Sequence, residues 1–231
     1  MKSNANRRGI HARLTLMVAL LAGFCFWAAP VLGSEAIEQL TKACFSGTVE
    51  TVAQLLNEGA DVNGRDKSGA TPLTNAVGMN KGSIVELLLT KGADPNLKEG
   101  FGDPPLLIAV KTWKNIATIR LLLDKGADPN LAGQIDDTPL IASARWGNTE
   151  LVTLLLARGA DVNKTGNMEA TPLIEACSTT MSGRVPTVKA LIDGGADVTR
   201  KGRFGITALE AAKRNKNEEI VKLLTEHGVK E

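Results

Sequence analysis

The pentapeptide Gly59-Ala60-Asp61-Val62-Asn63 returns four more times along the chain, with at most one substitution each time. The other copies are Gly92-Ala93-Asp94-Pro95-Asn96, Gly126-Ala127-Asp128-Pro129-Asn130, Gly159-Ala160-Asp161-Val162-Asn163 and Gly195-Ala196-Asp197-Val198-Thr199. The intervals between the leading glycines are 33, 34, 33 and 36 residues. Periods of this length are typical of one supersecondary unit that is copied and stacked into a solenoid.

A second motif, Thr-Pro-Leu, recurs in phase with the first, twelve residues after each glycine. Thr before Pro predicts a helix start, because the hydroxyl accepts a backbone N–H and Pro at the first helical position loses no hydrogen bond. Gly after an apolar run predicts a left-handed helix end. Each repeat therefore holds two short helices. The copies are Thr71-Pro72-Leu73, Pro104-Pro105-Leu106, Thr138-Pro139-Leu140, Thr171-Pro172-Leu173 and Thr207-Ala208-Leu209.

The seven residues between each pentapeptide and the next Thr-Pro-Leu are rich in turn formers, as in 64–70, and predict a projecting hairpin or finger. The aspartate of each pentapeptide is expected to bond to its own backbone, because Asx side chains close such turns.

On these two motifs the chain resembles an ankyrin-repeat protein from about residue 34 to 231. The resemblance implies an all-α solenoid of about six stacked units, each a helix-turn-helix with a hairpin finger. The histidine that commonly follows Thr-Pro-Leu in the family is replaced by Thr74, Leu107, Ile141, Ile174 and Glu210, which is expected to remove a loop-bracing hydrogen bond. The expected repeats are about 34–63, 64–96, 97–130, 131–163, 164–199 and 200–231.

Two repeats carry insertions that are expected to fall between their paired helices, away from the fingers. One residue is added around Trp113-Lys114, and three are added within Ser178 to Pro186. Loops at such places tolerate drift in length.

Residues 1–33 have the composition of a secretory signal peptide. They contain four basic residues and no acid, and residues 14–29 are almost wholly apolar. Val31 and Gly33 are small enough to precede a cleavage site, so the mature chain is expected to begin at Ser34. The apolar run is short for a membrane span, which needs about 20 residues.

Three alternatives to a cleaved signal stay open: an uncleaved membrane anchor, a lipoprotein and a twin-arginine signal. Phe24 before Cys25 disfavours the lipoprotein, and the residues after Arg7-Arg8 match a twin-arginine signal poorly. An ankyrin array behind a signal peptide resembles the periplasmic ankyrin proteins of Gram-negative bacteria. The resemblance implies a periplasmic location.

The charge balance depends on the signal segment. The chain has 27 basic and 25 acidic residues, and without the four basic residues of 1–33 the balance is 23 to 25, a net charge near −2. This composition shows no basic stripe of the kind that nucleic acid or an anionic membrane requires. We expect a monomer whose partner is another protein, with no contact to nucleic acid or, after signal cleavage, to membrane.

Few residues after position 33 can support catalysis. Cys44 and Cys177 fall in the first helices of the first and fifth repeats, about 40 Å apart, and are expected to be core residues, not a disulfide. With His227 as the single histidine, no catalytic triad and no tetrahedral zinc site can be assembled. We therefore expect no catalytic residues, no metal and no cofactor, and paired carboxylates are the one enzymatic alternative.

Aligning the fingers gives a column of tip residues that reads Ser68, Phe101, Ile135, Met168 and Phe204. Four successive tips thus carry large apolar side chains, at a position that is commonly polar in the ankyrin family. The family also contacts partners through the first-helix ends on the concave side. That region holds Trp and Arg, which are frequent interface hot spots. The predicted partner-binding residues are Phe45, Arg145 and Trp146 at helix ends, Phe101, Ile135, Met168 and Phe204 at fingertips, and the finger carboxylates Asp103 and Asp137.

The function expected from these features is a non-catalytic protein–protein interaction scaffold in the periplasm. An immunity-type inhibitor of a toxin or hydrolase, and a protector or organiser of a periplasmic enzyme, are narrower versions of it. The competing hypotheses are an enzyme, and a membrane-tethered adaptor with residues 14–29 as its anchor.

Overall fold

The computed structural model describes residues 33–112, 115–179 and 183–228, and in that part every regular element is a helix or a 3₁₀ turn. The predicted signal segment, apart from Gly33, lies outside the described residues, as do Trp113-Lys114 and residues 180–182 of the second insertion. A helix over 33–46 comes first. It is followed by α2 (Val49–Asn57), α3 (Pro72–Gly78), α4 (Gly82–Thr90), α5 (Pro105–Lys111), α6 (Ile116–Asp124), α7 (Pro139–Trp146), α8 (Thr149–Ala157), η1 (Asn167–Glu169), α9 (Pro172–Cys177), α10 (Val185–Asp193), η2 (Arg203–Gly205), α11 (Ala208–Arg214) and α12 (Glu218–Glu226).

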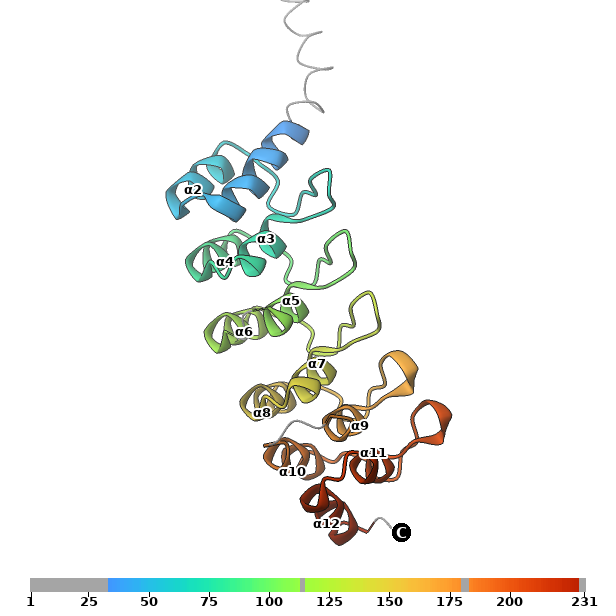
Figure 1. The fold of residues 1–231 in the computed structure, drawn as a ribbon. Coiled ribbons are helices and arrows are strands. Elements are labelled where there is room, and N and C mark those ends of the chain that lie inside the picture. The colour runs from blue at the N-terminus through green and yellow to red at the C-terminus, as the bar shows by residue number, and fades with distance from the viewer. Residues whose placement is uncertain (1–32, 113–114, 180–182, 229–231) are drawn as a thin grey trace, which may run out of the picture.

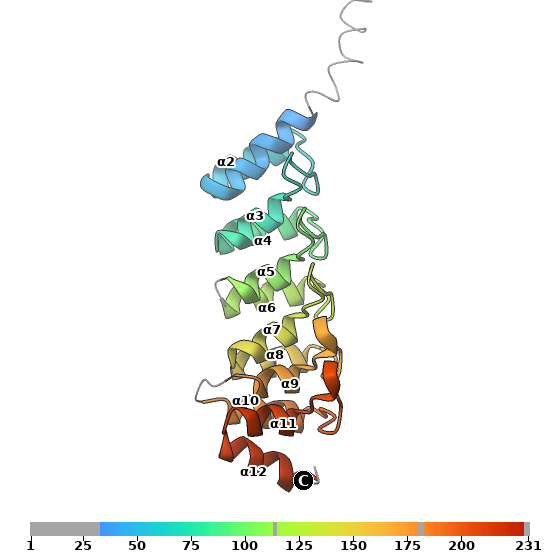
Figure 2. The same ribbon diagram turned by 45° about the vertical axis from the view of Figure 1, so that its right-hand side comes forward.

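The helices form pairs that stack one above the next, with the fingers projecting along one side of the stack (Figure 1). First helices contact first helices in the series α3, α5, α7, α9 and α11, and second helices contact second helices in the series α2, α4 and α6 and the series α8, α10 and α12. The turned view shows the same single column (Figure 2). The predicted all-α solenoid of helix-turn-helix units is therefore confirmed. Among the described helices, none has the length and apolar character needed to cross a membrane.

The helix boundaries lie where the two motifs place them. The hydroxyls of Thr71, Thr138, Thr171 and Thr207 accept backbone N–H groups at the starts of the first helices, whereas Pro104 makes no such bond. The glycine of every pentapeptide, from Gly59 to Gly195, has a φ between 83 and 94°, a conformation that an L side chain rarely adopts.

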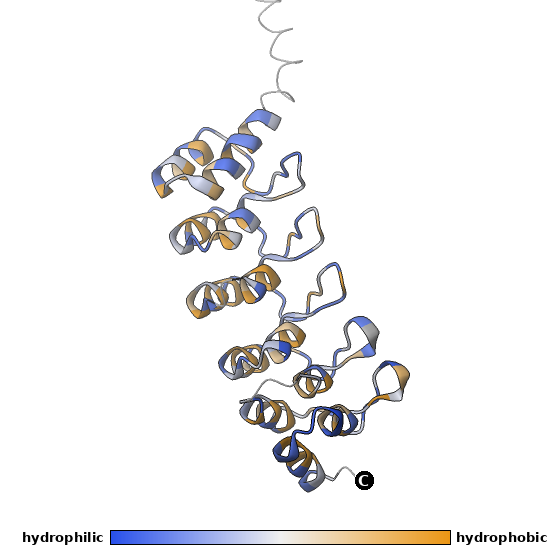
Figure 3. Ribbon diagram, in the orientation of Figure 1, coloured by the Kyte–Doolittle hydropathy of each residue, from blue (hydrophilic) through white to orange (hydrophobic). Residues whose placement is uncertain are grey.

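Hydrophobic residues concentrate in the paired helices of the stack (Figure 3), and the buried ones form one core cluster. Four residues before the glycine that ends each later repeat stands a leucine with no exposed surface, and these residues are Leu88, Leu122, Leu155, Leu191 and Leu224. Cys44 and Cys177 are also buried and both are free thiols, as expected of core residues. One continuous core runs through the stack, so each repeat depends on its neighbours for burial.

The aspartates of the pentapeptides close their own turns, as predicted. The Asp61 carboxylate accepts the Asn63 N–H at 2.9 Å, and the same bond recurs in the other four copies at 2.8 to 2.9 Å.

The asparagine that ends each of the first four pentapeptides bonds to the following repeat, a contact that the motif alone did not predict. Asn63 donates to the Gly92 carbonyl at 3.2 Å and accepts the Asp94 N–H at 2.8 Å. Asn96, Asn130 and Asn163 form the same two bonds one repeat further on. Thr199, in the fifth copy, instead donates its hydroxyl to Asp197 of its own turn. This asparagine ladder joins repeats one to five.

The residues that stand in place of the family histidine are of two kinds. Leu107, Ile141 and Ile174 are buried apolar side chains at this position. Thr74 and Glu210 instead accept the backbone N–H of the N-cap threonine, at 2.9 and 2.7 Å, in reciprocal capping boxes. The expected loss of polar bracing is therefore compensated locally in the second and sixth repeats.

Candidate partner-binding face

All five fingers are closed by the same backbone bond, from the third finger residue to the carbonyl of the seventh. In the second repeat the Asp66 N–H donates to Ala70 O at 3.0 Å, and the equivalent bonds in the later fingers measure 2.9 to 3.0 Å. A shared closure holds the tip residue, two positions after the donor, at the same place in each finger. The tips therefore follow one another along the edge of the stack seen in Figure 2.

The fingertip side chains are exposed where the structure describes them. Phe101 is 70%, Ile135 51% and Phe204 82% exposed, while the side chain of Met168 lies outside the described part. The other large apolar side chains exposed in the described ranges are Phe45 at 54% and Trp146 at 50%, and both stand at first-helix ends. Every large exposed apolar side chain of the described part thus lies on a fingertip or at the end of a first helix.

The tip of the last finger has a distinct backbone. Phe204 has φ 63° and ψ 18°, in the left-handed region that costs a non-glycine residue about 1 kcal/mol. The Arg203 guanidinium lies over its ring, 5.1 Å from the centroid, within the range of a cation–π contact. The local backbone conformation therefore holds the phenyl ring at the surface of the protein.

The third repeat pairs its first-helix cation with its own finger. Lys111 Nζ lies 3.0 Å from an Asp103 carboxylate oxygen, and the other oxygen accepts the Gln134 N–H of the next finger at 3.2 Å. Asp103 is thus positioned between two fingers and is already committed to Lys111.

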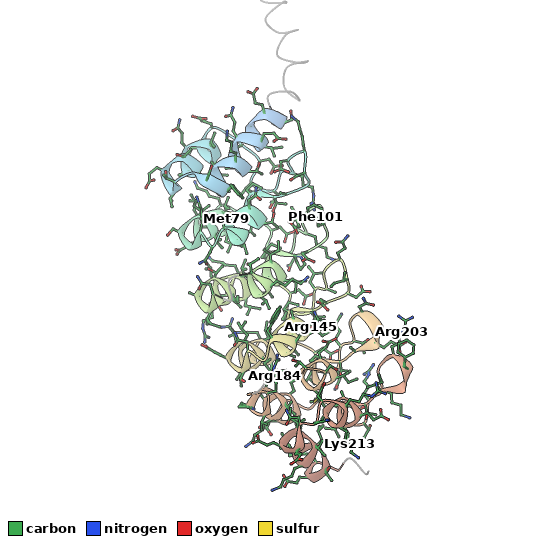
Figure 4. The ribbon with its side chains drawn as sticks, viewed as in Figure 1. Met79, Phe101, Arg145, Arg184, Arg203 and Lys213 are labelled. Carbon is green, nitrogen blue, oxygen red and sulfur yellow. The ribbon has the colours of Figure 1, made fainter. Side chains whose placement is uncertain are left out.

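The fourth repeat forms a larger version of this pair. Arg145 donates to both oxygens of Asp137, at 2.6 and 2.8 Å, and to Glu175 of the next repeat at 2.9 Å. The Asp137 carboxylate is 1% exposed, while Arg145 is 38% exposed. The two carboxylates hold the pKa of Arg145 above its usual range, with the hydrogen bonds that Arg145 donates to Asp137 as the largest cause. Figure 4 shows Arg145 at the end of its helix beside the fingers.

These pairs change the roles expected for three of the predicted contact residues. Asp137 lies beneath Arg145 and presents almost no surface to a partner, because its finger position aims the carboxylate at the helix end. Asp103 is partly covered in the same way. Arg145 keeps an accessible outer side. Glu175, which joins the fourth repeat to the fifth, was missed, because a contact 30 residues away depends on the stacking register.

Arg184, within the segment 178–186 that holds the second insertion, is a further residue whose role the sequence did not reveal. It is 2% exposed, and its guanidinium donates to the Ala144 carbonyl at the end of α7 at 2.9 Å. Burial lowers its pKa from the usual value. A Cβ at Gly147 would lie 2.7 Å from this side chain, so the glycine makes room for it. Lys81, at the same repeat position, donates to the Gly47 carbonyl at 2.8 Å.

The described residues show no group of three His, Cys, Asp or Glu side chains that could hold a metal ion. Burial raises the pKa of both the Cys44 and the Cys177 thiol to about 12, and nearby Lys81 opposes this at Cys44. Thiols in that state are poor nucleophiles.

Comparison with protein families matches the ankyrin-repeat model, in three copies that cover residues 16–99, 79–166 and 106–202. Among solved structures, an ankyrin repeat domain from Acinetobacter baumannii AYE is 30% identical with a TM-score of 0.78, over 83% of this chain and 98% of that one. The ankyrin repeat protein EF0377 is 29% identical with a TM-score of 0.76, over 82% and 97%.

The human ASB11 ankyrin repeat domain is 29% identical with a TM-score of 0.69, over 83% of this chain and 84% of that one. A comparison with curated proteins found no match.

Proposed function

This chain belongs to the ankyrin-repeat family, and on that premise we propose that it is a non-catalytic scaffold of the periplasm that binds another protein through its fingertips and first-helix ends. Ankyrin repeats generally mediate protein–protein interaction. The periplasmic part of the proposal rests on the signal-like residues 1–33.

The observation that carries the proposal is the distribution of exposed apolar side chains. All five large ones in the described part stand on fingertips or first-helix ends. Exposed apolar clusters on soluble proteins mark interaction sites, and Trp and Arg, here Trp146 and Arg145, are frequent hot spots. The second helices, on the other side of the stack, present no large exposed apolar side chain within the described ranges.

The energetics require more than the fingertips alone. Burial of four side chains of this size on a partner contributes about 6 to 12 kcal/mol. Association costs about 4 to 15 kcal/mol in lost freedom. Tight binding therefore needs polar contacts beside the apolar tips.

The experiment that tests the proposal is capture from the native periplasm by the full chain carrying a C-terminal tag. It is run beside a variant with Phe101→Ser, Ile135→Ser, Met168→Ser and Phe204→Ser. A matched control changes four exposed residues of second helices, in Glu86→Ser, Arg120→Ser, Thr153→Ser and Lys189→Ser. We expect the parent and the control to retain the same protein and the fingertip variant to lose it, with all three folded by circular dichroism.

Equal capture by the fingertip variant would exclude the tips as the contact. Capture of nothing by the parent would refute the scaffold itself. Intact mass of the tagged chain tests the location separately, because a periplasmic form beginning at Ser34 requires signal cleavage, whereas a form that retains Met1 in the membrane fraction contradicts it.

A further inference from the structure

The third and fourth repeats neutralise a first-helix cation with an aspartate that ends the finger, and the sixth repeat does not. Lys111 and Arg145 stand seven residues after the N-cap residue and pair with Asp103 and Asp137. Arg214 occupies the same position in the sixth repeat. There the finger residue equivalent to Asp137 is Ile206, so the finger offers no carboxylate to Arg214.

The same repeat concentrates positive charge around that position. Residues 200–216 hold a single acid, Glu210. Its carboxylate accepts the Thr207 N–H at 2.7 Å, and this hydrogen bond is the largest cause that holds its pKa below the usual value, with Arg214 and Lys201 contributing. All six cations of the segment are exposed; they are Arg200, Lys201, Arg203, Lys213, Arg214 and Lys216. Figure 4 shows Arg203 on the last finger and Lys213 below it on α11.

A pocket with several apolar lining residues opens beside this basic segment. Its volume is about 160 Å³, and it lies between the last two fingers and α9. A cavity of about 150 Å³ accepts one benzene-sized group, so this pocket suits one leucine, isoleucine or phenylalanine side chain. Its one acid, Glu175, is already bonded to Arg145 at 2.9 Å. The lining residues are Ala170, Ile174, Glu175, Ser178, Arg203, Phe204 and Ile206, with Gly202.

From this geometry we infer that the sixth repeat binds an acidic segment of the partner protein, which inserts one apolar side chain into the pocket and sets its carboxylates against Lys201, Arg203 and Arg214. The inference rests on the proposed function and names the chemistry of the partner. The charge favours an anion, and the apolar pocket favours a peptide over a sugar-phosphate chain or a lipid headgroup. Opposite charge also speeds encounter, and this contribution weakens with salt.

The opposite end of the stack supplies the contrast. Residues 34–63 hold five acids and one base, and the hollow beside Phe45 includes Glu35, Glu38 and Asp66. The first repeat therefore repels the ligand that the sixth attracts, which fixes the position of an acidic segment along the stack.

The test measures fluorescence anisotropy of a labelled peptide with one leucine flanked on both sides by pairs of glutamates, titrated with the full chain. Its companions replace the leucine with serine, or the glutamates with lysines. The first protein variant is Lys201→Glu, Arg203→Glu and Arg214→Glu. The matched control, with the same change in net charge, is Lys42→Glu, Arg65→Glu and Lys67→Glu at the other end of the stack.

Loss of three exposed ion pairs should weaken binding of the acidic peptide about tenfold or more in the first variant. The control should retain affinity within about twofold of the parent. A second variant, Ser178→Phe, puts a bulky side chain among the residues that line the pocket without changing charge and should also weaken binding, whereas Ser178→Thr keeps the hydroxyl that bonds to Ile174 O at 2.7 Å and should not. The serine and lysine peptides should bind more weakly than the acidic leucine peptide.

Equal weakening by both charge variants would overturn the inference, since the attraction would then be a property of net charge. Tighter binding of single-stranded DNA, or of vesicles containing phosphatidylglycerol, than of the acidic peptide would overturn it in favour of those ligands. A dimer of the parent chain that is seen by sedimentation, and that is absent from the sixth-repeat charge variant, would also overturn the inference. Periplasmic capture that depends on the fingertips, together with absence of peptide binding, would refute this inference and leave the scaffold standing.

Discussion

The fourth and sixth repeats carry arginine at the same helix position and use it in opposite ways. Arg145 pairs with Asp137 and Glu175, which neutralise its charge within the chain, while 38% of its side chain stays exposed. Arg214 is exposed, the finger of its repeat ends in Ile206 where the fourth repeat has Asp137, and residues 200–216 hold five other exposed cations. A repeat can therefore make one position structural in one copy and available in another by changing a single finger residue.

The two repeats also differ in how they are tied to the stack. The fourth receives Arg184 from the fifth, and its Asn163 carries the last rung of the asparagine ladder that the structure describes. The sixth contacts the fifth through packing of α9 against α11 and of α10 against α12, and the Asn215 side-chain amide donates to the Cys177 carbonyl at 2.8 Å. The fourth repeat thus has more hydrogen bonds to its neighbour, and the sixth repeat has more accessible positive charge.

The largest expected effect comes from removing the arginine that ties the fifth repeat to the fourth. Arg184→Ala loses a buried side chain and its bond to the Ala144 carbonyl, so it should lower the free energy of unfolding by about 3 kcal/mol. Urea unfolding followed by circular dichroism measures this. At the equivalent position of the sixth repeat, Asn217 caps α12, and Asn217→Ala should cost only about 1 kcal/mol. Equal losses would contradict the contrast between the repeats.

Breaking the buried pair of the fourth repeat should come next. Asp137→Ala leaves Arg145 with Glu175 alone, and because Arg145 is 38% exposed, water limits the loss to about 2 kcal/mol. The reference is Asp103→Ala, which breaks the more exposed pair with Lys111 and should cost about 1 kcal/mol. Both are measured by urea unfolding, and a larger loss at Asp103 would reverse the assignment of the stronger pair.

Introducing the aspartate of the fourth repeat into the sixth should pair Arg214 with its own finger, as Arg145 is paired with Asp137. Ile206→Asp supplies Arg214 with a finger carboxylate, so stability should change by less than about 1 kcal/mol, because lost apolar burial offsets the new pair. The acidic leucine peptide should bind about fivefold more weakly. Ile206→Asn, which adds no charge, separates the two causes: an equal loss of affinity there would mean that the carboxylate is not the reason.

The smallest effect is a difference in acid sensitivity. Hydrogen bonding from Thr207 lowers the folded pKa of Glu210, so its contribution is present above the unfolded value and is lost as pH falls through the folded pKa. At the same position the fourth repeat has Ile141, which does not titrate. Urea midpoints of the parent and of Glu210→Gln should therefore differ at neutral pH and converge at about pH 3. If the two urea midpoints differ by the same amount at neutral pH and at about pH 3, the effect comes from the shape of the side chain and not from its charge.

The sequence predicted what is local and periodic, and missed what depends on the stacking register. Helix starts at Thr71 and Thr138, helix ends at Gly59 and Gly92, and the apolar fingertips at Phe101, Ile135 and Phe204 could all be predicted, because one repeat determines them. Glu175 and Arg184 act on residues 30 and 40 positions away, which only the stack brings together.

The finger carboxylates were interpreted as partner contacts for the same reason. Asp137 looks like a surface residue in its finger, and only the helix end behind it reveals its bond to Arg145. The aligned repeats nevertheless show the signal that could have found these pairs. Asp103 and Asp137 end the fingers of the repeats that carry Lys111 and Arg145, whereas Ile206 ends the finger of the repeat that carries Arg214.

The asparagine ladder ends at Thr199, and this has a mechanical consequence. A force applied to the C-terminal end of the stack acts on α11 and α12 before it acts on the asparagine ladder. The hydrogen bonds of the ladder, from Asn63 to Asn163, lie further from the site where the force is applied. The sixth repeat should then detach as one early step at low force, and each later step should break a rung. A partner held on that repeat would be released while the rest of the solenoid stays intact.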